Sequence, residues 1–201
     1  MREAFAEVCP QLEQQPYLLY LSRIHEKKGV DILIKAYLGL LKRKQETSLA
    51  LPKLVIAGPG LETSYGLRMQ KLVADCTGAD SHIFFTGMLS DDTKWGAFYG
   101  CEAFILPSHQ ENFGIAIVEA LACSKPVLIS DQVNIWREIM NAGSGIVVAD
   151  TLEGTEQAIF SWLNVSSDNR QLMGRRAYST FTNNFAIAPA TRRLLSAVSE
   201  A

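Results

Sequence analysis

The sequence predicts an α/β domain built in three layers, α/β/α, with a parallel sheet of about six strands and helices at its C-terminal end. Short apolar runs alternate with longer amphipathic segments over the first three quarters of the chain. Most of the short runs are β-branched or aromatic, as strands buried on both faces are. Strand–helix alternation of this kind produces a parallel sheet with helices on both faces.

Six runs of four to six residues are expected to form the strands. They span residues 17–22, 53–57, 83–86, 103–106, 126–129 and 145–148. Between the first two, apolar residues recur at the spacing of one helix face: Val30, Leu33, Ile34, Tyr37 and Leu41.

A second helix is expected around residues 67–74, with Gly78 as its C-cap, and a third begins at Ser90, followed by two acidic residues. After Asp150 the strand pattern stops. The last quarter is expected to form helices over residues 158–163, 172–181 and 191–198.

The composition restricts the function classes. The chain has 201 residues, with 19 Lys plus Arg against 21 Asp plus Glu, so its formal charge is −2. With 48% hydrophobic and 20% charged residues, it is expected to form a single domain over residues 1–201 rather than a disordered chain. The near-neutral charge argues against a dedicated nucleic-acid-binding protein, which needs a basic face.

The cysteines and the N-terminus predict a cytoplasmic chain. Cys9, Cys76, Cys101 and Cys123 are widely spaced and form no C-x-x-C pair, so reduced thiols are expected. No run approaches the ~20 apolar residues of a membrane-spanning helix. Residues 1–15 also lack the apolar core of a signal peptide.

Chemistry is expected in the loops that follow the strands, because parallel strands bring their carboxyl ends to one edge, where ligands bind. Arg23 and Lys28 flank a short loop after the first strand. A guanidinium fork and an ammonium group together suit a diphosphate. A solvated basic loop explains the same spacing, and the residues alone favour that alternative.

The second strand runs into Ala-Gly-Pro-Gly at residues 57–60. The dinucleotide fingerprint G-x-G-x-x-G would need a small residue at position 63, where Thr63 stands, and an acidic residue after the next strand, which ends at Gly87. A nicotinamide dehydrogenase is therefore disfavoured, and a plain tight turn is the alternative.

The segment from residue 106 to 122 is the most informative. Glu111 lies in the loop after the fourth strand, and a helix is expected to begin at Phe113 or Gly114, with free N–H groups that suit phosphate. Glu119 stands in this otherwise apolar helix. A buried carboxylate needs partners. They are either the hydroxyls of a ligand diol or a neighbouring cation or backbone amides of the protein.

The histidines and serines indicate no further chemistry. The spacing of His25, His82 and His109 fits no metal site, and no G-x-S-x-G marks a nucleophile elbow. His109 is expected either to line the site or to cap its turn.

Together these motifs resemble the C-terminal, donor-nucleotide-binding domain of a retaining glycosyltransferase of the GT-B fold, family 4, the glycosyl transferases group 1. The resemblance covers roughly residues 16–165. It rests on Arg23 with Lys28, on the turn at residues 57–60, and on Glu111 and Glu119 separated by seven residues.

The resemblance implies a Rossmann-like domain that binds a nucleotide-diphosphate sugar, from which a hexose is transferred to an acceptor. Arg23 and Lys28 would hold the diphosphate and stabilise the departing nucleotide, so that neither a metal nor a cofactor is required. Glu111 would face the sugar hydroxyls as the third catalytic residue, and Glu119 would bind the ribose diol. The other donor-binding residues would be Gly58, Gly87, Met88, Asn112, Phe113, Gly114 and Ile115.

The sequence departs from the family pattern in a few places. Ser22 stands where Gly is usual, Asn112 where a small residue is common, and Ser124 with Lys125 where Gly-Thr or Gly-Leu is usual. None of these changes removes a charged binding residue.

The larger departure is length. Only about 15 residues precede the first strand, whereas the family's acceptor site lies in an N-terminal Rossmann-like domain of about 150 to 200 residues. The expectation is a donor half that is inactive alone. Its partners would be the nucleotide sugar and that N-terminal domain, and the full enzyme would associate peripherally with a membrane.

Three other interpretations stay open. The first is a complete, non-catalytic module that binds a nucleotide sugar. The second is a GT-B-related epimerase acting on a UDP-sugar, which would need further catalytic acids. The third is a flavodoxin-like receiver, which would need an acidic cluster where this sequence has basic loops.

Overall fold

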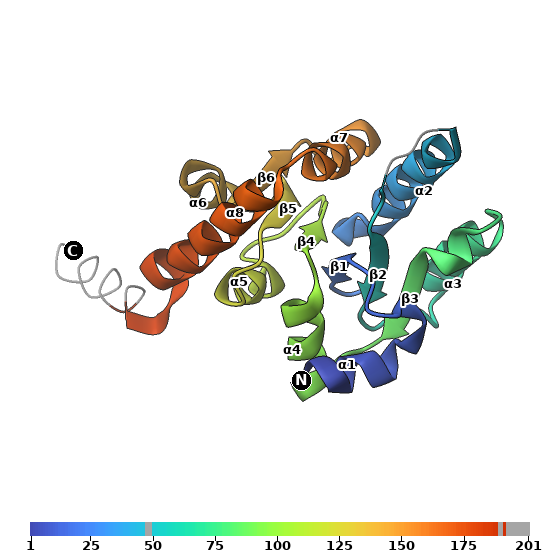
Figure 1. Cartoon of the computed structure of the whole chain (residues 1–201), viewed down its shortest axis with the longest axis horizontal. Helices are drawn as coiled ribbons and strands as arrows, with labels where there is room; N and C mark the ends of the chain where they lie inside the picture. Colours follow the sequence, from blue (N-terminus) through green and yellow to red (C-terminus); the bar gives the residue numbers. More distant parts are fainter. Residues whose placement is uncertain (47–49, 189–190, 192–201) are drawn as a thin grey trace.

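The computed structural model describes residues 1–46, 50–188 and 191. Its centre is a fully parallel six-stranded sheet in the order β3-β2-β1-β4-β5-β6 (Figure 1). The predicted parallel sheet is confirmed, and each strand lies within one residue of its predicted range. The strands are β1 (Tyr17–Leu21), β2 (Lys53–Ala57), β3 (Ile83–Gly87), β4 (Ala103–Leu106), β5 (Val127–Ser130) and β6 (Gly145–Val148).

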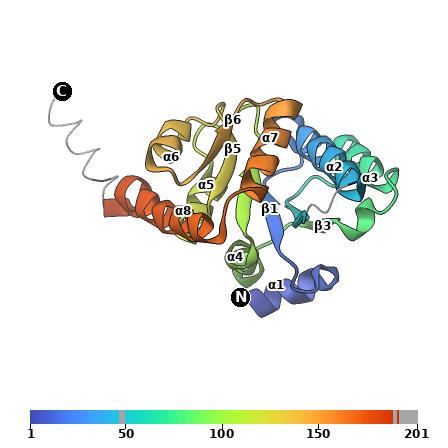
Figure 2. The same cartoon turned by 45° about the horizontal axis from the view of Figure 1, so that its top comes forward.

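Helices cover both faces of the sheet. On one face lie α2 (Val30–Glu46), α3 (Ser64–Ala74) and α7 (Leu152–Leu163), with α7 beside α2 (Figure 2). The other face carries α4 (Asp91–Gly100), α5 (Ile115–Ala122) and α6 (Trp136–Ala142). Right-handed crossovers require α2 and α3 on one face and α4, α5 and α6 on the other, because the chain moves from β1 to β3 in one direction and from β3 to β6 in the other. Helix α7 follows the last strand and belongs to no crossover.

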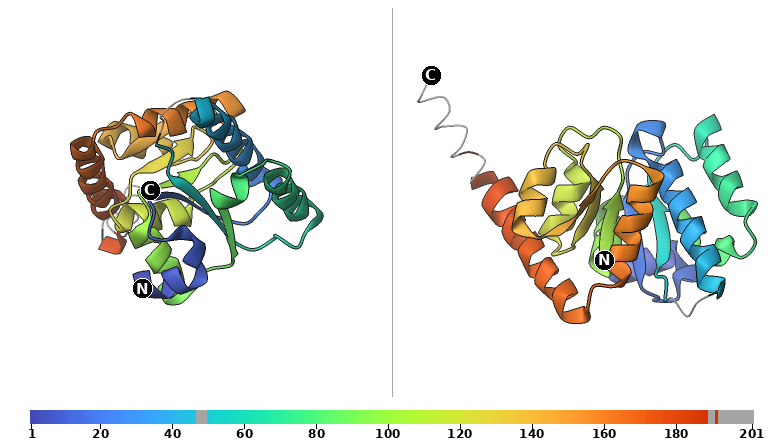
Figure 3. Two further views of the ribbon diagram at one scale, coloured as in Figure 1. Left: turned by 45° about the vertical axis from the view of Figure 1, so that its right-hand side comes forward. Right: turned by 90° about the horizontal axis from the view of Figure 1, so that it is seen from above.

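Two further helices pack on the second face. α8 (Ser167–Thr180) lies against α5 and α6, on the side of the molecule away from α3 (Figure 3). A π-helical turn, η4 (Phe181–Phe185), follows α8 and contacts α5. The N-terminal helix α1 (Arg2–Val8) packs on α4.

Side-chain caps explain where several helices begin. Thr63, Thr151 and Ser166 each accept a hydrogen bond from a backbone N–H three residues on, and so start α3, α7 and α8. Ser90 and Thr93 form a capping box at the start of α4. The predicted start of that helix at Ser90 is therefore confirmed.

The structure corrects several details of the prediction. Gly78 is not the C-cap of α3, a position that Asp75 occupies; it is instead the N-cap of a 3₁₀ turn, η3 (Ala79–Ser81). Helices α1 and α6 were not expected. The helix expected over residues 191–198 lies, beyond residue 191, outside the described residues.

The hydrophobic core fills the space between the sheet and its helices. Its largest fully buried side chains come from strands and helices of both halves of the sheet. The predicted apolar face of α2 is buried as expected. This packing fixes the strand ends, from which the loops of the carboxyl edge emerge.

Candidate functional site

The order of the strands creates a crevice at the carboxyl edge of the sheet. The chain leaves β1 toward β2 and leaves β4 toward β5, so the loops after these two neighbouring strands diverge. Ligands of open α/β sheets bind at such a switch point. The loop with Arg23 and Lys28 and the loop with Glu111 are the two loops concerned.

Backbone contacts hold these two loops together. The N–H of His109 and the hydroxyl of Ser108 both donate to the carbonyl oxygen of Lys27, at 2.9 and 2.8 Å. Gly29 has a φ of +66°, and a Cβ there would collide with the carbonyl oxygen of Pro107. Only glycine fits where the two loops pass this close to each other. Their close contact brings Lys28 against the loop after β4.

Lys28 and Glu111 form an ion pair at the switch point. The Lys28 Nζ lies 2.6 Å from Glu111 Oε2 and 3.3 Å from the carbonyl oxygen of Gln110. The side chains are 14% and 18% exposed. Glu111 is fixed further by its own backbone, which pairs with Gln132 and Asn134 in the loop after β5. A cation and a carboxylate thus meet where a diphosphate and a sugar were expected.

Arg23 takes no part in this ion pair. Its side chain is exposed and makes neither an ion pair nor a hydrogen bond within residues 1–46, 50–188 and 191. Its carbonyl oxygen accepts from the hydroxyl of Tyr20 at 3.0 Å, and burial raises the pKa of Tyr20. Tyr20 therefore anchors the start of the loop and leaves the guanidinium at the surface.

The start of α5 faces the same edge. Gly114, with a φ of +74°, is the N-cap, and Ile115 is the first helical residue. The prediction of a helix start near residues 113 and 114 is confirmed to within two residues. Phe113 and Ile115 are 47% and 69% exposed, and Asn112 is also exposed. The ring of Phe113 packs edge-on against Phe185 of η4, with centroids 5.9 Å apart. This aromatic contact ties the C-terminal turn to the loop before α5.

Glu119 is less buried than its sequence environment indicated. Its side chain is 21% exposed, because α5 is not covered on all sides. Oε1 accepts a hydrogen bond from the Nζ of Lys94, on α4, at 2.7 Å. The sequence left three kinds of partner possible for this carboxylate: ligand hydroxyls, a neighbouring cation or backbone amides. The structure shows a neighbouring cation. Among the described residues, no hydrogen bond of its second oxygen, Oε2, is found.

The turns after β2 and β3 complete this edge. The N–H of Gly58 donates to the carbonyl oxygen of Gly87 at 2.8 Å. The N–H of Ile24 donates to the carbonyl oxygen of Pro59 at 2.9 Å. Met88 follows at 73% exposure. The turns containing Gly58 and Gly87 therefore adjoin each other and the loop of Arg23, whereas Met88 projects outward.

Sequence reasoning missed two polar contacts. One is Lys94, whose pairing with Glu119 depends on how α4 and α5 pack and has no local signal. The other is the pair of His109 Nδ1 and Asp150 Oδ2, 2.9 Å apart, which joins the loops after β4 and β6. His109 had been assigned either to the site or to its turn, and the structure places it at the carboxyl edge.

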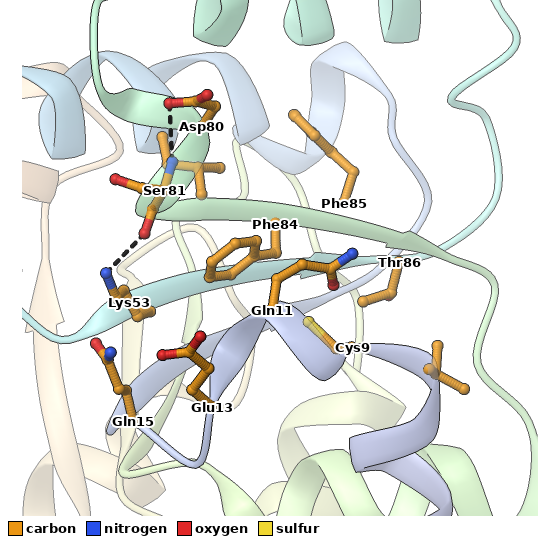
Figure 4. Close-up of a pocket in the computed structure, with 12 residues that line it drawn as sticks. Cys9, Gln11, Glu13, Gln15, Lys53, Asp80, Ser81, Phe84, Phe85 and Thr86 are labelled. Atoms are coloured by element: carbon orange, nitrogen blue, oxygen red, sulfur yellow. Dashed lines mark hydrogen bonds between the residues drawn. The ribbon is translucent and has the colours of Figure 1, made fainter.

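Cavities lie beside this edge and away from it. One of about 530 Å³ flanks the loop after β1 on the side of α2 and α3 and includes Lys27 and His109. A larger one, of about 770 Å³, lies along the edge strand β3 and the 3₁₀ turn η1 (Pro10–Leu12) (Figure 4). Its lining includes none of the predicted site residues. Its lysine, Lys53, donates to the carbonyl oxygen of Ser81.

No three His, Cys, Asp or Glu side chains gather closely enough among the described residues to hold a metal ion. None of the helices that the structure describes has the length and apolar character to cross a bilayer.

Comparison with known proteins identifies relatives of the chain. The family described as "Glycosyl transferases group 1" matches residues 1–180. The alpha-D-kanosaminyltransferase of Streptomyces kanamyceticus is 31% identical over 137 residues, which are 68% of this chain and 33% of that protein. The GDP-mannose-dependent alpha-(1-6)-phosphatidylinositol monomannoside mannosyltransferase of Mycolicibacterium smegmatis is 29% identical over 158 residues, 75% of this chain and 38% of the relative.

Solved structures share the fold. A glycosyltransferase from Rickettsia africae superimposes with a TM-score of 0.77 at 24% identity, over 98% of this chain and 52% of the other. The Anabaena HepE protein in complex with UDP-glucose gives 0.78 at 17% identity, over 99% and 53%. The chain thus spans about half the length of these solved proteins and a third or slightly more of the curated relatives.

Proposed function

The chain belongs to the glycosyl transferases group 1 family, and we propose that it binds the nucleotide-diphosphate sugar of a retaining glycosyltransferase that transfers a hexose to an acceptor. One observation carries the proposal. The cation-bearing loop after β1 and the loop after β4 come to one switch point, where Lys28 contacts Glu111 directly, and Glu119 lies on the helix that follows. This arrangement suits a diphosphate flanked by hydroxyl groups.

In this proposal the cations act on the leaving group. During transfer, the bond between the anomeric carbon and the diphosphate oxygen breaks, a bond from that carbon to an acceptor hydroxyl oxygen forms, and the hydroxyl proton passes to the departing diphosphate. Negative charge then grows on the departing nucleoside diphosphate. Arg23 and Lys28 would stabilise this charge electrostatically, with the free N–H groups at the start of α5.

The glutamates would bind hydroxyls. Glu111 would accept from the sugar once Lys28 turns to the diphosphate, and Glu119 would accept from the ribose through the oxygen that Lys94 leaves open. The turns at Gly58, Gly87 and Met88 would border the base. The acceptor would come from a second, N-terminal Rossmann-like domain, so we expect no transfer by this chain alone.

Isothermal titration of the chain with UDP-, GDP- and ADP-sugars tests the proposal. The relatives' names include a GDP-mannose-dependent enzyme and a UDP-glucose complex, so the base must be determined by experiment. Binding of one of these donors is expected. If a folded sample binds none of them, the proposal is wrong.

Replacing Glu119 by Gln tests the ribose contact. Losing the charged acceptor should weaken nucleotide binding about tenfold or more, since hydrogen bonds to charged groups contribute about 1.5 to 3 kcal/mol. Glu7→Gln, an exposed change on α1, serves as the control. An unchanged affinity combined with a large fall in melting temperature would instead indicate that Glu119 is structural.

The alternative is a non-catalytic module that binds the same ligands without taking part in transfer. Co-expression with an N-terminal half from a relative distinguishes the two. Transfer that depends on Arg23 and Lys28 supports the enzyme, and donor binding without transfer supports the module.

A further inference from the structure

The ion pair of Lys94 and Glu119 connects two helices that approach the carboxyl edge on the same face of the sheet. The Nζ of Lys94 lies 2.7 Å from Glu119 Oε1, across 25 residues of sequence. The side chains are 24% and 21% exposed. The same ammonium stands 4.6 Å from the centre of the Trp95 ring. The lysine side chain is therefore held by two contacts, the ion pair with Glu119 and the cation–π contact with Trp95.

We propose that Lys94 is a positioning residue that sets the protein's selectivity for ribose over 2′-deoxyribose in the bound nucleotide. The inference rests on the proposed function, in which Glu119 accepts from the ribose diol. By occupying Oε1, Lys94 fixes the orientation of the carboxylate and leaves Oε2 for the hydroxyls. Lys94 contacts Glu119 and not the reacting atoms, so its role is indirect.

The position of Lys94 supports this role. Its backbone N–H donates to the carbonyl oxygen of Ser90, which caps α4 directly after the turn of Gly87 and Met88. That turn is expected to border the base. The ion pair therefore connects α4, which follows the turn expected to border the base, with the Glu119 carboxylate, which is expected to bind the ribose. It thereby fixes the position of the ribose site relative to the base site.

A purely structural role explains the pair less well. Ion pairs that are partly exposed add little to folding stability, and apolar residues of the same volume often serve as well. A role in ligand selectivity explains the contact of Lys94 with Glu119 better. A site built to hydrogen-bond a hydroxyl rejects an analogue that lacks it, because the polar group is left without its partner. That rejection requires the carboxylate to be held in place.

The experiment measures selectivity rather than affinity alone. Isothermal titration first identifies which of UDP, GDP and ADP binds best, and then compares that nucleotide with its 2′-deoxy counterpart. For the unmodified chain we expect about 10- to 100-fold tighter binding of the ribonucleotide, as one charged hydrogen bond provides. Lys94→Met should reduce this ratio at least about fivefold, and Lys94→Arg should restore most of it.

Lys125→Met is the matched control. Lys125 is also partly buried and donates to the carbonyl oxygen of Cys101 at 2.7 Å, near the opposite ends of the strands. Its loss should lower the melting temperature without changing the ratio. Lys94→Gln, measured in parallel, keeps a donor without the charge and supplies the result should Lys94→Met not fold.

The outcomes separate the two proposals. A folded chain that binds none of the three nucleotides disproves the proposed function, and this inference with it. If a nucleotide binds but the ratio is close to one in the unmodified chain, or is unchanged in Lys94→Met, or in Lys94→Gln where Lys94→Met does not fold, only the role of Lys94 is disproved. A ratio that falls equally in Lys125→Met also disproves it.

Discussion

Replacing Lys28 by Met and Glu111 by Gln should change the affinity for a bare nucleoside diphosphate in opposite directions. In the unliganded chain the two side chains are paired at 2.6 Å. Lys28→Met removes the cation and leaves the carboxylate to repel the diphosphate. Glu111→Gln removes the group that competes with the diphosphate for the ammonium.

The structure gives the size of both effects. A hydrogen bond from a charged donor contributes about 1.5 to 3 kcal/mol, so Lys28→Met should weaken binding about 10- to 150-fold. Exposed ion pairs contribute about 0.2 to 1 kcal/mol. The Lys28–Glu111 pair is only 14% and 18% exposed, so its contribution should lie at or above the top of that range. Freeing the lysine should therefore strengthen binding about 5- to 10-fold.

The assay is isothermal titration with UDP, GDP and ADP, without a sugar. Omitting the sugar matters because Glu111 is expected to contact the sugar, and a sugar donor would mix the two roles. Lys27→Met is the control, since it makes the same charge change in the same 3₁₀ turn, η2 (Glu26–Lys28), at an exposed side chain. It should weaken binding less than about threefold.

Weaker binding in both variants, by similar factors, would refute this reasoning, because it would mean that the pair acts as one structural unit. Equal losses in Lys27→Met and Lys28→Met would refute it as well, since the effect would then come from net charge rather than from position.

Two further predictions concern stability and thiol reactivity. Gly29→Ala should destabilise the fold by about 2 to 4 kcal/mol in urea unfolding, because a positive φ is combined with a collision at the Pro107 carbonyl. Gly78→Ala, at a φ of +79° with open space around the Cβ, should cost only about 1 to 2 kcal/mol, and equal losses would contradict the collision. Mass spectrometry after iodoacetamide treatment at pH 8 should find Cys76 alkylated well before Cys101, because burial raises the pKa of the Cys101 thiol to about 12; early modification of Cys101 would contradict its burial.

The fold followed from the sequence because its signals are local. Apolar runs predicted the strands, and polar caps such as Ser90 marked helix starts. Helix α6 was missed because it has only seven residues and its N-cap, Ile135, provides no side-chain hydrogen bond. Gly78 was misassigned because a residue with positive φ can start a turn as well as end a helix.

The site was predictable in its location but not in its pairings. The switch-point rule places the loops of Lys28 and Glu111 together, since it depends only on strand order. The contact of Lys94 with Glu119 depends on how two helices pack. The burial of Glu119 was overestimated because an apolar sequence indicates where a helix can pack, not that every side of it is covered.

The charges at the carboxyl edge indicate how an anion would be attracted there. Each glutamate of the pair has its own lysine, Lys28 for Glu111 and Lys94 for Glu119, and these four charges cancel. Two neutral pairs exert little attraction beyond the Debye length, about 8 Å at physiological salt. Arg23 has no such partner among the residues described, and its guanidinium is exposed. In the proposed site, Arg23 would therefore attract the diphosphate first, and Lys28 would turn from Glu111 only once the phosphate oxygens are within hydrogen-bond distance. Arg23 should then govern the salt dependence of the association rate, whereas Lys28 should govern dissociation.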